Sequence, residues 1–354
     1  MNLNVEKNKT LFVVGPAFLS LLEGEACILA APLQPNQKIK VRNGKATPIY
    51  CKKDSRFEIT LGKDASIHMV DGSTIPQDWE KVSWMVMDLA EKQNLVVMVV
   101  GGVDVGKTSF TVFLANKAYK KSLKVNFIDA DVGQSDVGPP TTIGTLQLKN
   151  FVYDLFYENP DQIIFVGSTT PSNIQTRMVE TVSSLCWESK QKFNLTVLNT
   201  DGWVYGEEAQ TYKLTMAKKS NVDWVVVFQS EETVNLIEKL RENGLNVFEV
   251  KPSTLVKKRS REERRKIRWQ TYQKYMKNST IRVLPLDKIK IFGFNFWKQG
   301  LIVGLYGANK KFLGIGVLKE INPRKNMVKI FTPVKEKIDE VEIGQTIVDL
   351  NFKS

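Results

Sequence analysis

The stretch GGVDVGKT, residues Gly101–Thr108, decides the fold of the central part of this chain. It satisfies the Walker A pattern G-x4-G-K-[ST], whose glycines let backbone N–H groups turn inward around phosphate oxygens. The apolar run Leu95–Val100 leads in as a buried strand, and an apolar helix leads out. The N-terminus of that helix adds the positive end of its dipole. The sequence therefore predicts a strand–loop–helix unit that binds the phosphates of a nucleoside triphosphate.

Two side chains of this loop carry specific tasks. Lys107 supplies a cation for the β- and γ-phosphates, and Thr108 supplies a hydroxyl for Mg²⁺. We assign the whole loop and the residue after it to nucleotide binding: Gly101, Gly102, Val103, Asp104, Val105, Gly106, Lys107, Thr108 and Ser109.

Around this loop, compact apolar strands alternate with helical stretches. The strands are predicted over 95–100, 124–129, 163–167, 195–200, 224–228 and 246–250. Their continuous apolar character is typical of strands buried on both faces of a parallel sheet. The segments Ser172–Lys190 and Glu231–Glu242 each place apolar residues on one helical face. This alternation predicts an α/β domain with a mostly parallel sheet.

The two ends of the chain contain short strands separated by turns rich in Gly, Pro and Asn. With 354 residues, two or three domains are expected. We predict an N-terminal β domain over 1–80, a P-loop domain over 81–282 and a C-terminal β domain over 283–354. An arginine-rich lid is predicted over about 257–276, within the P-loop domain.

Composition excludes several classes of protein. The dispersed Cys27, Cys51 and Cys186 form no CxxC pair, which argues against a disulfide framework or a zinc site and suits a reducing cytoplasm. The single histidine, His68, carries no catalytic argument. The apolar stretch Leu11–Leu22 is interrupted by Gly-Pro, so we expect two short strands around a turn. No apolar run approaches the roughly 18 residues that cross a bilayer, and we predict a cytoplasmic protein without a membrane partner.

Half of the formal net charge of +12 lies in twelve residues. Lys257–Arg268 (KKRSREERRKIR) holds eight Lys and Arg against two Glu. Arg261, Arg264, Arg265 and Arg268 form one helical stripe, and arginine suits bidentate recognition of phosphate. We interpret this segment as a lid over the nucleotide; the alternative is a solvated helix face. The following Trp269, Tyr272 and Met276 are expected to pack.

The strand after the P-loop helix ends in Asp129-Ala130-Asp131-Val132-Gly133-Gln134. Its carboxylates should emerge at the carboxyl edge of the sheet, where ligands bind in open α/β folds. One acid can hold Mg²⁺ while another orients or deprotonates an attacking hydroxyl. For each aspartate the alternative is a cap on the turn before Gly133, and spacing does not decide between them.

Six motifs occur in an order that resembles the RNA 5′-hydroxyl polynucleotide kinase family: GGVDVGKT, DADVGQSDVGPPTTIG, VGSTTPSN, NTDGWVYG, VDWVVVF and KKRSREERRKIR. They span residues 95–270, and we expect an archaeal or bacterial member. Eukaryotic members of that family act in pre-mRNA 3′-end cleavage, tRNA splicing and ribosomal RNA processing. The family's layout, a P-loop kinase domain between two β domains, agrees with the predicted division.

The resemblance implies roles for individual residues. It matches Lys107 and Thr108 to the P-loop pair, and Asp131, rather than Asp129, to the catalytic acid that activates the RNA 5′-hydroxyl and lies at the metal. Gln134 would lie beside it.

Further matches concern the substrate and the lid. Thr169–Asn173 resembles the family's clasp, with Thr169 or Thr170 in the threonine role and Asn173 in the asparagine role. The alternative is an ordinary turn with Ser172 or Asn173 as the helix cap. Trp203 matches the tryptophan that stacks on a terminal RNA base, the alternative being a core tryptophan. The lid arginines recur at the family's spacing: Arg259, Arg264 and Arg268.

The sequence thus predicts ATP-dependent phosphorylation of the 5′-hydroxyl end of RNA, or of DNA as well, with ATP and Mg²⁺ as cofactors. One rival is a catalytically inactive ATP-binding scaffold of an RNA-processing complex. Another is a P-loop NTPase switch, although an NKxD motif for guanine is absent from the sequence. The choice of ATP over GTP rests on the resemblance, and the sequence identifies no protein partner.

Overall fold

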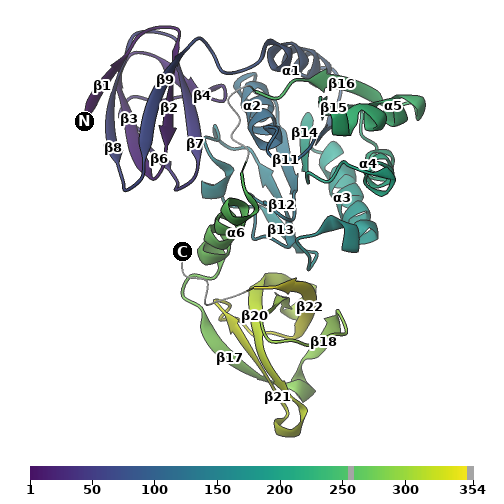
Figure 1. Ribbon diagram of the computed structural model, residues 1–354. Coiled ribbons are helices and arrows are strands. Elements are labelled where there is room, and N and C mark those ends of the chain that lie inside the picture. The colour runs from purple at the N-terminus through teal and green to yellow at the C-terminus, as the bar shows by residue number, and fades with distance from the viewer. Residues whose placement is uncertain (254–258, 349–354) are drawn as a thin grey trace. The chain divides into compact units, whose positions relative to one another are not determined.

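The computed structural model describes residues 1–253 and 259–348, so Lys257 and Lys258 of the predicted lid lie outside the described residues. The chain forms two compact units, each built from three segments. Figure 1 labels the helices and strands of which they are made. The first comprises 1–127, 147–158 and 186–259, and the second comprises 128–146, 159–185 and 260–354. The predicted division into three domains stays a prediction.

The N-terminal residues form two antiparallel sheets. One sheet has the order β1 (Asn2–Val5), β8 (Ser55–Leu61), β3 (Ala17–Glu23), β6 (Lys38–Val41), and the other the order β5 (Ala31–Pro32), β4 (Ala26–Ile28), β7 (Ala46–Cys51), β2 (Lys9–Val14), β9 (Ser66–Asp71). Residues from both sheets, such as Leu19 and Ile49, share one core. The stretch Leu11–Leu22 forms parts of β2 and β3, which confirms the expected pair of strands. His68 is exposed on β9 and its ring stacks on Phe12.

Seven strands form the sheet of the α/β part. Its order is β13 (Gln162–Phe165), β12 (Thr142–Gln147), β11 (Val125–Ala130), β14 (Leu195–Thr200), β10 (Leu95–Val100), β15 (Trp224–Phe228), β16 (Asn246–Val250). The central β10 is entirely buried and runs parallel to both β14 and β15, as predicted. Two details differ from the prediction. β13 pairs antiparallel to β12 and is only partly buried, and β12 itself was not predicted.

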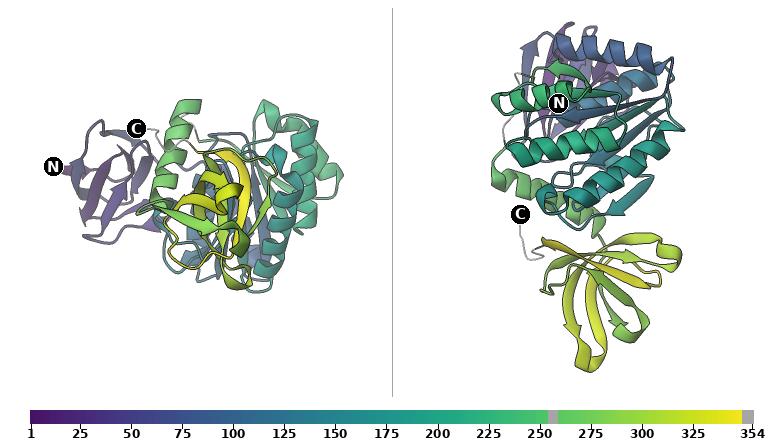
Figure 2. Two further views of the ribbon diagram at one scale, coloured as in Figure 1. Left: turned by 90° about the horizontal axis from the view of Figure 1, so that it is seen from below. Right: turned by 90° about the vertical axis from the view of Figure 1, so that its right-hand side faces the viewer.

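Helices flank this sheet (Figure 2): α1 (Gln77–Ala90), α2 (Lys107–Lys120), α3 (Gln175–Lys190), α4 (Glu207–Lys219) and α5 (Val234–Glu242). In the first unit α1 packs against α2, and α4 packs against α5. The ring of Trp79 on α1 contacts Phe110 and Phe113 on α2 and Phe228 on β15. This aromatic cluster fixes the beginning of α2, where the phosphate loop ends.

The second unit contains α6 (Arg261–Tyr275) and a six-stranded sheet. The sheet has the order β17 (Thr280–Pro285), β21 (Met327–Thr332), β20 (Phe312–Asn322), β19 (Leu301–Tyr306), β22 (Glu340–Ile347), β18 (Lys290–Gly293). Tyr272 of α6 is buried with Ile302 and Val317 of this sheet, and Trp269 and Met276 pack around them. The predicted packing role of that stripe is confirmed.

Short 3₁₀ helices complete the described elements: η1 (Leu155–Tyr157), η2 (Pro171–Asn173), η3 (Glu231–Thr233), η4 (Leu286–Lys288), η5 (Ala308–Lys310) and η6 (Pro323–Lys325). Across residues 1–253 and 259–348, no helix combines the length and apolarity needed to span a membrane.

Candidate functional site

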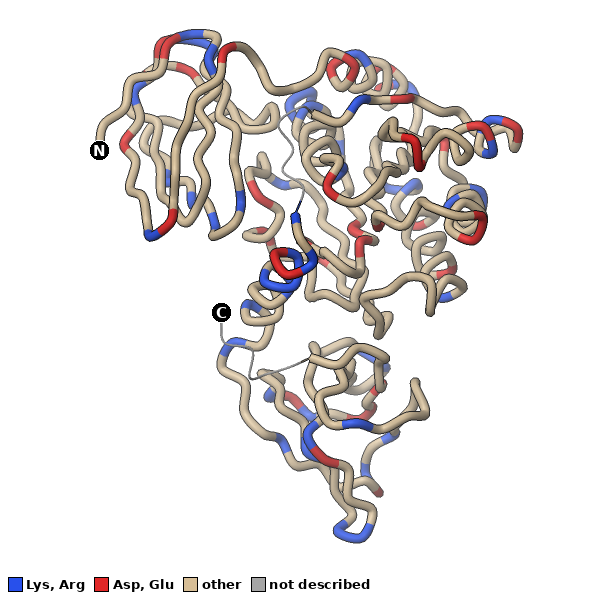
Figure 3. The backbone as a smooth tube through the Cα atoms, in the orientation of Figure 1, with Lys and Arg blue, Asp and Glu red and all other residues tan. Residues whose placement is uncertain are grey.

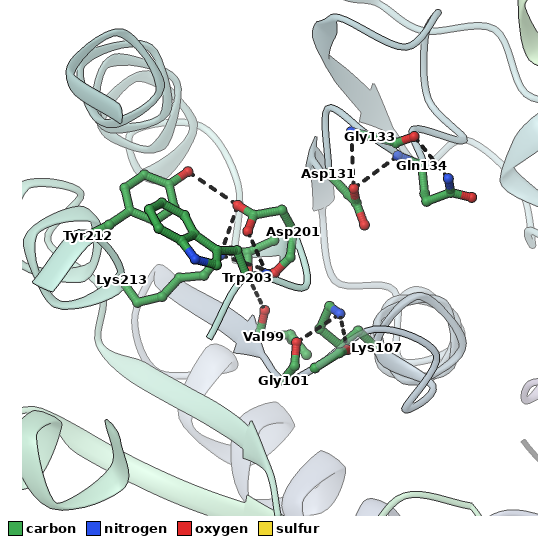
Figure 4. A network of polar contacts seen from close by, with 12 residues as sticks. Val99, Gly101, Lys107, Asp131, Gly133, Gln134, Asp201, Trp203, Tyr212 and Lys213 are labelled. Atoms are coloured by element: carbon green, nitrogen blue, oxygen red, sulfur yellow. Dashed lines mark hydrogen bonds and ion pairs between the residues drawn. The ribbon is translucent and has the colours of Figure 1, made fainter. Parts of the chain in front are cut away.

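The phosphate loop joins β10 to α2, and its glycines meet two separate steric demands. A Cβ on Gly101 would lie 2.7 Å from the Cβ of Phe228, so the turn can approach β15 only without a side chain. Gly106 precedes α2 with a φ of 102°, in the left-handed region that favours glycine. Lys107 is buried, and its Nζ donates to the carbonyls of Gly101 (3.0 Å) and Gly102 (2.7 Å) (Figure 4). The ammonium group is therefore held against the loop itself.

The loop after β14 packs against the tip of the phosphate loop. A Cβ on Gly202 would lie 2.6 Å from Cγ2 and 3.0 Å from N of Val103, so glycine is needed at this contact. The next residue, Trp203, is partly exposed rather than part of the core. Its backbone N–H donates to Oδ1 of Asp201 (3.0 Å), and its ring lies 5.7 Å from that of Tyr212. The first unit thus brings Trp203 next to the phosphate loop in space.

A buried ion pair holds the Trp203 loop. Lys213 is fully buried, and its Nζ lies 2.9 Å from Oδ2 of Asp201 and donates to the Asp201 carbonyl (3.1 Å). The hydroxyl of Tyr212 also donates to Oδ2 of Asp201 (3.2 Å) (Figure 4). Sequence reasoning missed this network, because a lysine within an amphipathic helix normally faces solvent.

Asp104 links the phosphate loop to Arg259, at the beginning of the described part of the predicted lid. Its φ is 55°, and its carboxylate accepts from the backbone N–H of Arg259 (2.9 Å) and from the Arg259 guanidinium (3.3 Å). The carboxylate is 8% exposed and the guanidinium 31% exposed. Of the three predicted lid arginines, Arg259 is therefore the one that the first unit places at the phosphate loop.

The two aspartates that the sequence could not separate differ in this structure. Asp129 is buried and accepts from the backbone N–H groups of Asp131, Asp136 and Val137 and from the Ser135 hydroxyl. These four hydrogen bonds give it a structural role in shaping the loop.

Asp131, by contrast, is partly exposed. Its Oδ1 accepts from the N–H groups of Gly133 (3.2 Å) and Gln134 (3.0 Å), which orients the carboxylate at the turn (Figure 4). Turn capping therefore applies to both aspartates, and it does not exclude the proposed catalytic role of the more accessible Asp131.

Helix α6, which forms most of the predicted lid, begins with a reciprocal cap. Ser260 Oγ accepts from the N–H of Glu263 (3.1 Å), and the Glu263 carboxylate accepts from the N–H of Ser260 (2.7 Å). Lys and Arg gather on the first turns of this helix (Figure 3). Two acidic residues also lie in its first turn, where they oppose the positive end of the helix dipole.

The arginines of α6 fall into two groups by exposure. Arg264 and Arg268 are partly buried, whereas Arg261 and Arg265 are exposed. Burial lowers the pKa of Arg268, and the neighbouring Arg264 and Arg265 lower it further, while Tyr272 and Asp131 act in the opposite direction. The backbone carbonyl of Arg264 accepts from Nε2 of Gln134 (3.4 Å). The second unit thus gathers Asp131, Gln134 and two predicted lid arginines.

The predicted clasp forms η2 and the residues before it. Thr169 is partly buried, and its N–H donates to Oγ1 of Thr346 on β22 (3.0 Å). Its carbonyl oxygen lies 3.1 Å from where a Cβ on Gly133 would stand, so this carbonyl lies beside the Asp131 turn. Thr170 and Asn173 are exposed. Thr170 occupies the cap position of η2, without a side-chain hydrogen bond.

The loop fits a phosphate ligand, because two glycines are sterically required and an ammonium group lies among its carbonyls. In the described part of the chain, no group of three or more His, Cys, Asp or Glu is arranged as a metal cage. The cysteines Cys27, Cys51 and Cys186 are free and buried.

Residues 101–278 match the family described as "mRNA cleavage and polyadenylation factor CLP1 P-loop". The chain belongs to this family of P-loop proteins, which confirms the resemblance found in the sequence. The match begins at the phosphate loop and extends beyond α6.

Several archaeal relatives carry the name polyribonucleotide 5′-hydroxyl-kinase, and two of them illustrate the match. The one from Methanocaldococcus jannaschii is 27% identical over 340 residues, covering 78% of this chain and 93% of that protein. The one from Pyrococcus furiosus is 27% identical over 331 residues, covering 77% and 92%. Among solved structures, the Clp1p–Pcf11p complex matches with a TM-score of 0.78 at 15% identity, covering 98% of this chain and 97% of that one. This structural likeness confirms the predicted α/β fold.

Proposed function

We propose that this protein is a polynucleotide kinase that transfers the γ-phosphate of ATP to the 5′-hydroxyl end of RNA. Support comes from the family, from the names of the archaeal relatives and from an intact phosphate loop. The proposal covers the location as well: three buried, free cysteines suit the reducing cytoplasm.

The observation that carries the proposal is the contact between Gly202 and Val103. It holds a partly exposed tryptophan, Trp203, directly after a residue that touches the phosphate loop. A base stacked on an aromatic ring contributes about 1–3 kcal/mol and tolerates any base. A water nucleophile needs no such ring, whereas the terminal nucleotide of an RNA can use one.

The proposed catalytic residues divide the reaction between them. Lys107 and the N–H groups of the loop hold the triphosphate, and Asp131 accepts the proton of the RNA 5′-hydroxyl. The bond between the 5′-oxygen and the γ-phosphorus forms while the bond from that phosphorus to the β–γ bridging oxygen breaks, so ADP leaves. Arg259, Arg264 and Arg268 stabilise the charge that develops on the phosphoryl oxygens.

Substrate and metal contacts complete the proposal. Gln134, Thr169 or Thr170, and Asn173 position the RNA end beside Asp131. Thr108 and Asp131 would hold Mg²⁺, which would neutralise phosphate charge. Near Asp131, the Gln134 side chain is already fixed by hydrogen bonds to the carbonyls of Gly133 and Arg264.

The test is transfer of label from γ-labelled ATP to a 5′-hydroxyl oligoribonucleotide, with a DNA oligonucleotide and GTP in parallel. We expect labelled RNA from the wild type and a rate about 10²–10⁴-fold lower for Asp131→Asn, the range for a lost general base. Asp136→Asn is the matched control, since this partly exposed carboxylate lies in the same loop. It should retain activity.

Two results would contradict the proposal. Wild-type protein that binds ATP but labels no RNA would favour the inactive scaffold, as would an Asp131→Asn variant as active as the wild type. ATP turnover that is independent of any oligonucleotide would favour an NTPase switch.

A further inference from the structure

The segment Lys288–Lys298 (KIKIFGFNFWK) exposes aromatic side chains that the proposed reaction does not use. Phe292 is 37%, Phe294 41%, Phe296 60% and Trp297 48% exposed. These rings are not needed for the core of this sheet, which Val303, Ile330 and their neighbours fill. Four exposed aromatic side chains within six residues of a folded domain indicate an interaction site.

Within the segment the charge is positive, although Asp287 directly precedes it and Glu340 of β22 stands opposite Lys290. Lys288, Lys290 and Lys298 are exposed within the segment, and no Asp or Glu lies between the first and the last of them. Nζ of Lys290 lies 5.5 Å from the centre of the Phe292 ring. On the neighbouring β22, Glu342 is buried and already bound by Arg177 and the Tyr306 hydroxyl. Aromatic rings interleaved with lysines are typical of surfaces that bind single-stranded nucleic acid.

The backbone presents these rings at the edge of the sheet. β18 is an edge strand paired in parallel with β22. A Cβ on Gly293 would lie 2.5 Å from the carbonyl oxygen of Ile343, and its φ is 99°, so glycine is required there. The N–H of Phe294 then donates to the same carbonyl (2.9 Å). This hydrogen bond fixes the point at which the chain leaves the sheet toward Phe296 and Trp297.

A cavity of about 590 Å³ connects this edge to the predicted clasp. Phe294 and Gln345 line it on the side of the sheet, and Ser172 and Asn173 line it on the side of η2. Arg177 lines it as well, and its guanidinium is held by Glu342 and by the carbonyl of Phe165 (2.7 Å). The cavity therefore offers amide, hydroxyl and guanidinium groups between the clasp and the exposed rings.

We propose that Lys288–Lys298 binds the single-stranded RNA downstream of its phosphorylated 5′ end. The strand passes from the clasp along this cavity, bases stack on Phe296 and Trp297, and the lysines contact its phosphates. This inference rests on the proposed function, because it names the path of the same substrate. Charge complementarity and continuity with the clasp favour RNA over a protein partner.

The first test compares a 5′-hydroxyl dinucleotide with an oligoadenylate of roughly 12 nucleotides, near the upper site sizes of single-strand binders. For the variant Phe296→Ala/Trp297→Ala, we expect KM for the longer RNA to rise about 5- to 100-fold, the range for losing stacked bases. Phosphorylation of the dinucleotide should be unchanged. Trp187→Ala, which removes a tryptophan that is 68% exposed on α3, is the matched control and should behave as wild type.

A binding measurement separates this inference from the proposed function. Fluorescence anisotropy with the longer oligoadenylate needs no turnover, so weaker binding by the double variant supports the inference even if no phosphate is transferred. Replacing Lys288, Lys290 and Lys298 by Ala should reduce the slope of log K against log salt by up to about 2. Wild-type affinity for the longer RNA in both variants, or equal losses for both RNA lengths, would overturn the inference.

Discussion

Replacing Lys213 by Met tests the buried network that holds the Trp203 loop. The lysine is 0% and the Asp201 carboxylate 5% exposed, and their charged atoms are 2.9 Å apart. Met keeps the length and volume of the lysine stem but leaves the carboxylate without its counter-charge. Two donors remain for that carboxylate, the Tyr212 hydroxyl and the Trp203 N–H.

Breaking a buried pair by removing one partner costs about 3–5 kcal/mol, because an uncompensated charge stays buried. We therefore expect the free energy of unfolding in urea to fall by about 3–5 kcal/mol in Lys213→Met. Adding Asp201→Asn removes the orphaned charge and should recover part of this loss.

Lys92→Met is the matched control, because Lys92 pairs with Asp88 at 2.7 Å while both side chains are more than half exposed. It should cost less than about 1 kcal/mol. A loss in Lys213→Met no larger than in Lys92→Met would refute the reasoning, as would a double variant less stable than Lys213→Met alone.

Three further outcomes follow from particular contacts. Gly202→Ala places a methyl group against Val103 and displaces the phosphate loop, so ATP affinity should fall by up to about tenfold. Adding Val103→Ala should recover part of this loss. Unchanged ATP affinity in Gly202→Ala would contradict the contact. Replacing the partly buried Arg268 by Ala should lower kcat about 10³-fold or more, whereas replacing the exposed Arg265 by Ala should change kcat little. Equal losses of kcat in the two variants would contradict the different roles proposed for the partly buried and the exposed arginines. Burial raises the pKa of the Cys186 thiol from 9.0 to about 12, so on raising the pH the unfolded chain loses this proton before the folded chain does. The free energy of unfolding should therefore fall as the pH rises from about 9 to about 12. A thiol reagent that labels Cys186 in the native protein at neutral pH would contradict this burial.

The sequence predicted those strands and helices that a short run of residues is enough to mark. Five of the six predicted strands of the α/β part agree closely with the structure, because continuous apolar runs between turns mark buried strands. It missed β12, whose sequence TIGTLQ is too polar for that signal, although every residue but the last is buried. It also placed β13 in a parallel sheet, because an apolar run carries no information on strand direction.

The candidate site likewise contains features that local sequence predicts and features that depend on tertiary packing. Motifs marked the phosphate loop, the helix of the predicted lid and the Asp131 turn, because each depends on residues close in sequence, while the functional roles of the lid and of Asp131 stay predictions. The pairing of Lys213 with Asp201 and the approach of Gly202 to Val103 were not predictable, since both depend on packing between separate elements. The role of Asp129 in shaping its loop likewise required the hydrogen bonds that surround it.

The fate of the γ-phosphate tests the central claim most directly. Wild-type protein is incubated with γ-labelled ATP and a 5′-hydroxyl oligoribonucleotide, and label is counted in the RNA and in inorganic phosphate. The account predicts that the label appears at the RNA 5′ end and that a Lys107→Ala variant transfers none. Release of the label as inorganic phosphate, with none on the RNA, would contradict it.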